Sequence, residues 1–129
     1  MKNEMKKLGL EITMIVGLLG GVAQAATVTV MVSDGGFRPN RITIQQGDTV
    51  NFLSDARFTH TVTANPALAK DPANVVLPMG APTFNSGDLT KGQSFTQTFD
   101  VAGNYQYVCL QHEKFGMIGQ IVVEGADEE

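Results

Sequence analysis

Apolar and polar residues alternate in short segments along most of the chain beyond residue 26, and this pattern limits the fold more than any other feature. A period of two is typical of β-strands that bury one face. The alternation occurs in six segments: 27–32, 41–44, 49–53, 94–99, 104–108 and 118–123. Glycine-containing turns such as Gly35-Gly36 and Gln46-Gly47-Asp48 separate them. The sequence therefore predicts an all-β domain built as an antiparallel sandwich or barrel, and we favour the β-sandwich.

The segment 65–87 breaks this rhythm, because it contains Pro66, Pro72, Pro78 and Pro82. Connections of this length are uncommon inside a small domain and are often functional. We expect this one to be a structural crossover between the two sheets, with a functional loop as the alternative.

The N-terminus has the layout of a secretory signal peptide. Lys2, Lys6 and Lys7 precede a mostly apolar run over 8–22, which ends in Ala23-Gln24-Ala25. We expect residues 1–25 to be removed, which predicts an exported protein of the periplasm or an equivalent space, with no stable membrane insertion after cleavage. Glu11 interrupts the apolar run, so an uncleaved anchor is the alternative. The run is, however, shorter than the roughly 20 apolar residues of a spanning helix.

Removing residues 1–25 leaves 104 residues, which suits one domain over 26–129 with a frayed acidic tail at 125–129. This part of the chain has six basic and eleven acidic residues, so its net charge is near −5. An acidic chain without a basic stripe argues against nucleic-acid binding. Partner proteins with basic patches, or small solutes, fit this charge better.

The chain has a single cysteine, Cys109, although exported proteins usually pair their thiols. Cys109 is therefore a buried apolar residue, an intermolecular linker or a thiolate with chemistry of its own. Its surroundings favour the last of these. His112 and Met117 follow it with the spacing C-x2-H-x4-M, and Gly116 relaxes the backbone before Met117.

His60 is the only other histidine, and it lies near the start of a short β-branched strand predicted over residues 59–63. Taken one at a time, the two histidines and Met117 are ordinary loop or core residues. Together with Cys109 they form the donor set of a blue copper electron-transfer site, which suits both Cu(I) and Cu(II). Zinc accepts two histidines and a cysteine, but a thioether is a poor fourth ligand for it.

The segment 103–112 with Gly116-Met117 resembles the copper loop of the cupredoxin family, within its plastocyanin and pseudoazurin branch. The segments 47–50, 58–62 and 118–123 also resemble that family, so the resemblance covers about residues 27–123. It implies a Greek-key β-sandwich of about seven to eight strands with one copper ion at one end. It also implies His60, Cys109 and His112 as equatorial ligands and Met117 as the axial ligand.

The same resemblance implies a monomeric one-electron carrier that shuttles between larger redox proteins. A donor and an acceptor would touch it transiently near His112 and Phe115, with Glu113 and Lys114 at the edge of the contact. The chain departs from many relatives in having Thr59 and Thr61 where they have Pro and Asn. In relatives that Asn ties the histidine loop to the cysteine loop.

Three other functions compete with the electron carrier. Copper storage or delivery uses similar ligands in an open, exchangeable site. An enzyme would need further histidines for a second copper centre or a substrate position, and both histidines of this chain are already used, so we do not expect one. A structural β-sandwich with an incidental cysteine would bind no copper tightly.

Overall fold

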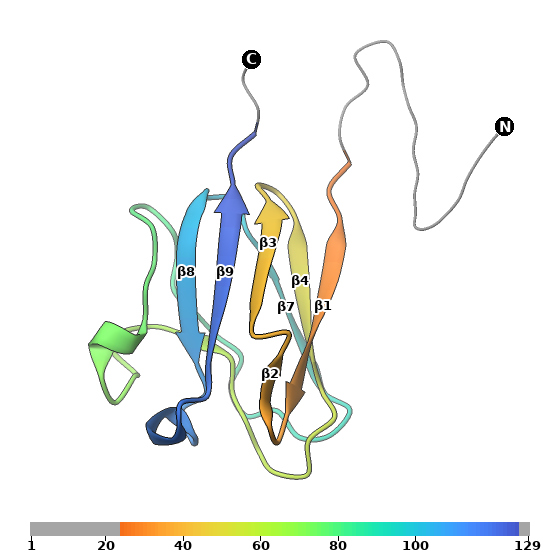
Figure 1. The fold of residues 1–129 in the computed structure, drawn as a ribbon, viewed down its shortest axis with the longest axis vertical. Helices are drawn as coiled ribbons and strands as arrows, with labels where there is room; N and C mark the ends of the chain where they lie inside the picture. Colours follow the sequence, from red (N-terminus) through yellow and green to blue (C-terminus); the bar gives the residue numbers. More distant parts are fainter. Residues whose placement is uncertain (1–23, 127–129) are drawn as a thin grey trace, which may run out of the picture.

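Two β-sheets pack face to face in the computed structural model, which describes residues 24–126 (Figure 1). The first sheet has the strand order β2-β1-β4-β7 and consists of β1 (Thr27–Ser33), β2 (Gly36–Arg38), β4 (Thr49–Ser54) and β7 (Ser94–Thr98). The second has the order β3-β9-β8-β5-β6 and consists of β3 (Arg41–Gln45), β5 (Thr63–Ala64), β6 (Phe84–Asn85), β8 (Gly103–Val108) and β9 (Ile118–Glu124). Two short 3₁₀ turns, η1 (Pro72–Asn74) and η2 (Glu113–Phe115), complete the described part.

The all-β sandwich predicted from the alternating pattern is confirmed. The described residues form nine strands rather than the expected seven to eight, because they include the two-residue segments β5 and β6, which no periodicity could mark. The predicted signal peptide spans residues 1–25, of which 1–23 lie outside the described residues, and so do residues 127–129 of the acidic tail. Within residues 24–126, no helix is long and apolar enough to cross a membrane.

Not every strand pair is antiparallel. β1 runs parallel to β4, and β3 runs parallel to β9. The reason is that β3 lies in the opposite sheet, so the chain returns to β4 in the direction of β1. This parallel register, from Thr27 opposite Thr49 to Val32 opposite Ser54, makes the ends of β1 and β4 neighbours.

The core lies between the sheets, where every second side chain of the central strands is buried. In β4 these are Val50, Phe52 and Ser54. The ring of Phe52 meets that of Tyr107 from β8 edge to face, with 5.4 Å between centroids. Tyr107 also lies over Gly119, where an added Cβ would come within 2.3 Å of the ring, so only glycine lets the ring pack here.

The segment 65–87 is not the crossover expected from the sequence, because β5 and β6 at its two ends belong to the same sheet. Between β5 and β6 the segment runs along β8 of the same sheet. Val76 exchanges two backbone hydrogen bonds with Gln106 of β8, at 3.1 and 2.9 Å. The chain crosses to the other sheet only afterwards, between β6 and β7.

Four connections gather at one end of the sandwich, the lower end in Figure 1. They are the β1–β2 turn, the β4–β5 connection, the β6–β7 connection and the β8–β9 loop. The predicted metal ligands lie on the second and the last of these.

Candidate metal centre

His60 lies in the β4–β5 connection, and its backbone is held in place by a neighbouring loop. Its N–H donates to the carbonyl of Leu89 at 3.1 Å, and its carbonyl accepts from the Leu89 N–H at 2.7 Å. These two bonds form an isolated bridge in place of the strand expected to begin here. The His60 side chain is only 1% exposed, so its ring is fixed inside the protein rather than on a mobile surface loop.

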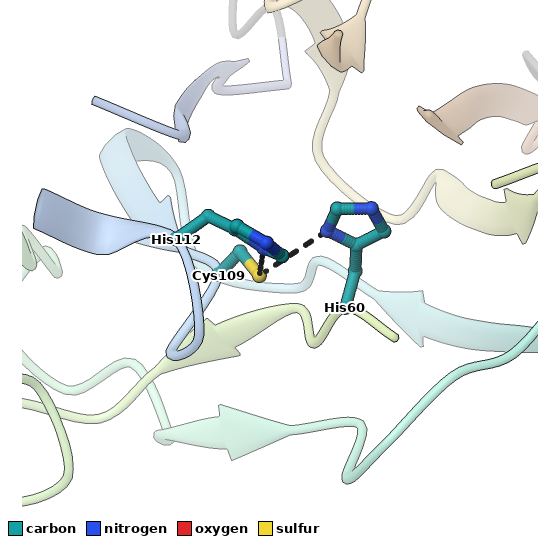
Figure 2. Close-up of side chains that lie close together, drawn as sticks. All are labelled: His60, Cys109 and His112. Atoms are coloured by element: carbon teal, nitrogen blue, oxygen red, sulfur yellow. Dashed lines mark hydrogen bonds between the residues drawn. The ribbon is translucent and has the colours of Figure 1, made fainter. Parts of the chain in front are cut away.

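Cys109 follows directly after β8 and is completely buried. Figure 2 shows its sulfur between two imidazoles, with Nδ1 of His60 and Nδ1 of His112 each 3.5 Å from Sγ. The three potential ligand atoms all lie within 4.8 Å of one another. Residues from two separate loops are thus brought to a single point.

The β8–β9 loop is closed by its own backbone. The N–H of His112 donates to the carbonyl of Cys109, and the N–H of Met117 donates to the carbonyl of His112, both at 3.2 Å. The N–H of Cys109 donates to the carbonyl of Met117 at 3.1 Å, which brings the two ends of the loop together. Gly116 has a φ of +83°, a conformation that glycine adopts without strain, as its place before Met117 predicted.

Thr61 connects the two loops. Its hydroxyl oxygen accepts a hydrogen bond from the N–H of Leu110 at 2.9 Å, and its backbone N–H donates to Sγ of Cys109 at 3.4 Å. Together these two bonds hold the sulfur of Cys109 and the backbone that follows it in place. The threonine therefore makes a tie between the histidine and cysteine loops, which the resemblance assigned to an asparagine.

Glu113 is buried, at 5% exposure, and does not lie at the edge of a contact surface as expected from the sequence. Its carboxylate accepts hydrogen bonds from the backbone of Lys70 and Asp71 and from the Asn74 side chain, at 2.9–3.0 Å. Burial, the largest influence, raises the pKa of Glu113, but these hydrogen bonds and the charge of Lys70 together outweigh it, so the pKa is lowered. The carboxylate thus anchors segment 70–74 to the ligand loop.

Asp34, in the β1–β2 turn, is a site residue that the sequence did not indicate. Its carboxylate lies 3.1 Å from Nε2 of His60. It also accepts hydrogen bonds from the backbone N–H groups of Arg57 at 2.9 Å and Phe58 at 3.1 Å. The hydrogen bond from Arg57 is the largest cause that holds the pKa of Asp34 well below its usual range.

The surface beside His112 is apolar and hollowed. Its open depression of about 440 Å³ is lined by His112, Met117, Phe58 and Phe115, among others. Phe58 and Phe115 are 58% and 74% exposed, and His112 is half-buried between core and solvent. We call the side chains of Phe58, His112 and Phe115 the apolar patch. Phe115 was expected here from the sequence, whereas Phe58 was not.

The sequence profile of the copper-binding proteins of the plastocyanin/azurin family matches residues 25–124. The chain belongs to this family. This cupredoxin is 33% identical over 106 residues to the chloroplastic plastocyanin of Tetradesmus obliquus, covering 79% of this chain and 69% of that protein. It is 31% identical over 100 residues to the plastocyanin of Vicia faba, covering 70% of this chain and 92% of that protein.

Solved cupredoxin structures agree with this assignment. A pseudoazurin from Sinorhizobium meliloti is 28% identical with a TM-score of 0.55, over 76% of this chain and 73% of that one. A reduced Cu(I) form of an amicyanin mutant is 26% identical with a TM-score of 0.59, over 80% and 86% of the two chains. Cupredoxins are electron carriers and bind copper, and copper is the cofactor of this member. Its buried cluster of two imidazoles and one thiol, beside a loop that contains Met117, fits that ion.

Proposed function

We propose that this cupredoxin carries single electrons between larger redox proteins outside the cytoplasm. The observation that carries the proposal is the convergence of the ligand atoms of His60, Cys109 and His112 within 4.8 Å, with His60 and Cys109 buried and His112 half-buried. In this proposal Nδ1 of each histidine and Sγ of Cys109 would hold one copper ion, with the thioether of Met117 as a weaker fourth ligand. The copper supplies the one-electron redox chemistry, and the residues keep the ligand geometry constant.

The proposed function requires that the ligand residues keep fixed positions. Fast electron transfer requires little rearrangement when the charge of the site changes. The backbone bonds of His60 to Leu89, the Thr61 tie and the closed β8–β9 loop supply that rigidity. The near-complete burial of His60 and Cys109 also counts against the alternative of copper storage or delivery, which needs a site that exchanges its metal readily.

The apolar patch supports the proposal that the protein acts as a monomer and binds its redox partners only briefly. His112 is the proposed ligand that extends towards solvent, and exposed Phe58 and Phe115 surround the depression beside it. Small apolar surfaces with few charges suit weak contacts that form and separate quickly. An electron would then leave or enter through the ring of His112. Cleavage before Ala26 and export to the periplasm are further parts of this proposal.

The visible spectrum of the purified protein with added Cu(II) tests the copper site, with Cys109→Ser as the control. We expect a strong sulfur-to-copper charge-transfer band that bleaches on reduction, returns on reoxidation and is missing from Cys109→Ser. A colourless protein with intact β-structure would overturn the electron-carrier proposal. A coloured protein that loses its copper to a weak chelator within minutes would instead favour storage or delivery.

A further inference from the structure

The two nitrogens of the His60 ring face different groups. Nδ1 points towards Sγ of Cys109 at 3.5 Å, whereas Nε2 points away from the cluster towards Oδ1 of Asp34 at 3.1 Å. A neutral imidazole has one N–H donor and one lone-pair acceptor. Since a carboxylate can only accept, the hydrogen belongs on Nε2, which leaves the lone pair of Nδ1 directed into the cluster.

Asp34 is held in this position by the same connection that carries His60. The backbone N–H groups of Arg57 and Phe58 both donate to its carboxylate, so its two oxygens are fixed before any contact with the ring. The parallel pairing of β1 with β4 ends at Val32 opposite Ser54, and this places the β1–β2 turn directly beside the β4–β5 connection. The carboxylate and the ring are therefore parts of one rigid arrangement.

We infer that Asp34 is a positioning residue of the copper site, which orients Nδ1 of His60 towards the metal and favours the oxidised state over the reduced state. This inference rests on the proposed function. A ligand histidine that donates its other N–H to a carboxylate is held in one tautomer and becomes a more basic ligand. A fixed negative charge one imidazole ring away also stabilises the site more when it carries the additional positive charge of Cu(II).

Two nearby groups bear on the strength of this effect. The guanidinium of Arg57 lies 3.6 Å from Asp34, but its side chain is 80% exposed, so water screens most of its opposing charge. The His60 ring is 1% exposed, so little water lies between the carboxylate and the cluster. The electron itself passes between the site and a partner protein, and the hydrogen stays on Nε2 in both states.

The test compares Asp34→Asn with a matched control, Asp55→Asn. The asparagine keeps the shape of the side chain and an oxygen that accepts from Nε2, but removes the charge. Asp55 belongs to the same end of the molecule and contacts Ser33 and Arg38 instead of His60. With the copper-loaded full protein at a fixed ambient potential, we expect Asp34→Asn to raise the ratio of reduced to oxidised protein by about threefold or more, and Asp55→Asn to leave it unchanged.

Asp34→Ala removes the orientation as well as the charge. We expect it to bind Cu(II) about tenfold or more weakly than the wild type, and Asp34→Asn to retain most of that affinity. If Asp34→Asn keeps a wild-type spectrum and the same ratio of reduced to oxidised protein as Asp55→Asn, the inference is wrong. If the wild-type protein with Cu(II) has no charge-transfer band, the proposed function itself is wrong.

A measurement on the unmodified protein covers the case in which the Asp34 variants do not fold. In the Cu(I) protein, which is diamagnetic, two-bond ¹⁵N–¹H NMR spectra of the histidine rings identify the protonated nitrogen. We expect hydrogen on Nε2 of His60 and none on its Nδ1, and we expect the Nε2–H proton signal to be shifted downfield because the carboxylate of Asp34 accepts this hydrogen. An Nε2 without hydrogen, or an Nε2–H whose proton signal is not shifted downfield by a hydrogen bond to the carboxylate, would overturn the role of Asp34.

Discussion

Thr61 serves both proposed ligand loops with two different atoms. Its N–H donates to the sulfur of Cys109, and its hydroxyl oxygen accepts from the N–H of Leu110, the next residue along. The side chain is 2% exposed, so water cannot replace the hydroxyl if it is lost. A buried N–H without a partner costs about 1–3 kcal/mol.

We therefore expect Thr61→Val, which keeps the shape of the side chain, to lower the free energy of unfolding of the metal-free protein by about 1–3 kcal/mol. Urea unfolding measures this change, provided that the slope against urea concentration is the same in both proteins. Thr61→Ser keeps the hydroxyl and is the control, for which we expect a smaller loss. Equal losses in the two variants would mean that the methyl group, and not the tie to Leu110, accounts for the effect.

The connection between β5 and β6 is hydrogen-bonded to the ligand loop. Segment 70–74 includes η1, which buries none of its residues, and it is fixed to η2 through the carboxylate of Glu113. This one side chain receives three hydrogen bonds from that segment, two of them from backbone N–H groups. The connection and the loop that follows Cys109 are thus expected to move together.

Glu113→Ala should release the connection without removing a proposed ligand. We expect faster hydrogen exchange at the amides of Lys70 and Asp71, together with a loss of about 1–3 kcal/mol in the free energy of unfolding. Lys114→Ala, at the exposed next position, is the matched control and should leave both quantities close to wild type. Unchanged exchange at Lys70 in Glu113→Ala would show that the connection is held by its other contacts.

At the scale of the whole molecule, local sequence patterns predicted some features of the fold and the site but not those that depend on distant residues. The alternation predicted the sandwich because burial on one face of a strand is a local property, and the C-x2-H-x4-M spacing predicted the loop because its ligands are close in sequence. Asp34 lies 26 residues before His60 in the sequence. It is placed beside His60 by the parallel β1–β4 pairing, which no local pattern specifies. Glu113 looked like a surface residue because its partners are about 40 residues away.

Charged side chains lie at both ends of the sandwich. Asp48, Asp100 and Glu124 lie at the end of the sandwich opposite the ligand loops, near the start of β4 and the end of β9. At the other end, Arg57 and Lys114 each lie over an exposed ring of the apolar patch, 5.4 Å from the Phe58 centroid and 5.2 Å from the Phe115 centroid. Two cations therefore border the rings of the patch directly, although the carboxylates of Asp34 and Asp55 lie at the same end of the molecule.

Contact through the patch is tested with Phe115→Asp and Val76→Asp. Both residues are exposed, at 74% and 42%, but Val76 pairs with the middle of β8 and lies outside the patch. A charged carboxylate at position 115 must be desolvated when an apolar partner surface closes over it, so fewer productive encounters form. We expect stopped-flow rates with the physiological partner to fall about tenfold or more in Phe115→Asp, with an unchanged visible spectrum, and to stay at the wild-type value in Val76→Asp. An unchanged rate in Phe115→Asp would exclude Phe115 from the contact, and equal falls in both variants would point to the added negative charge, because only Phe115 belongs to the patch.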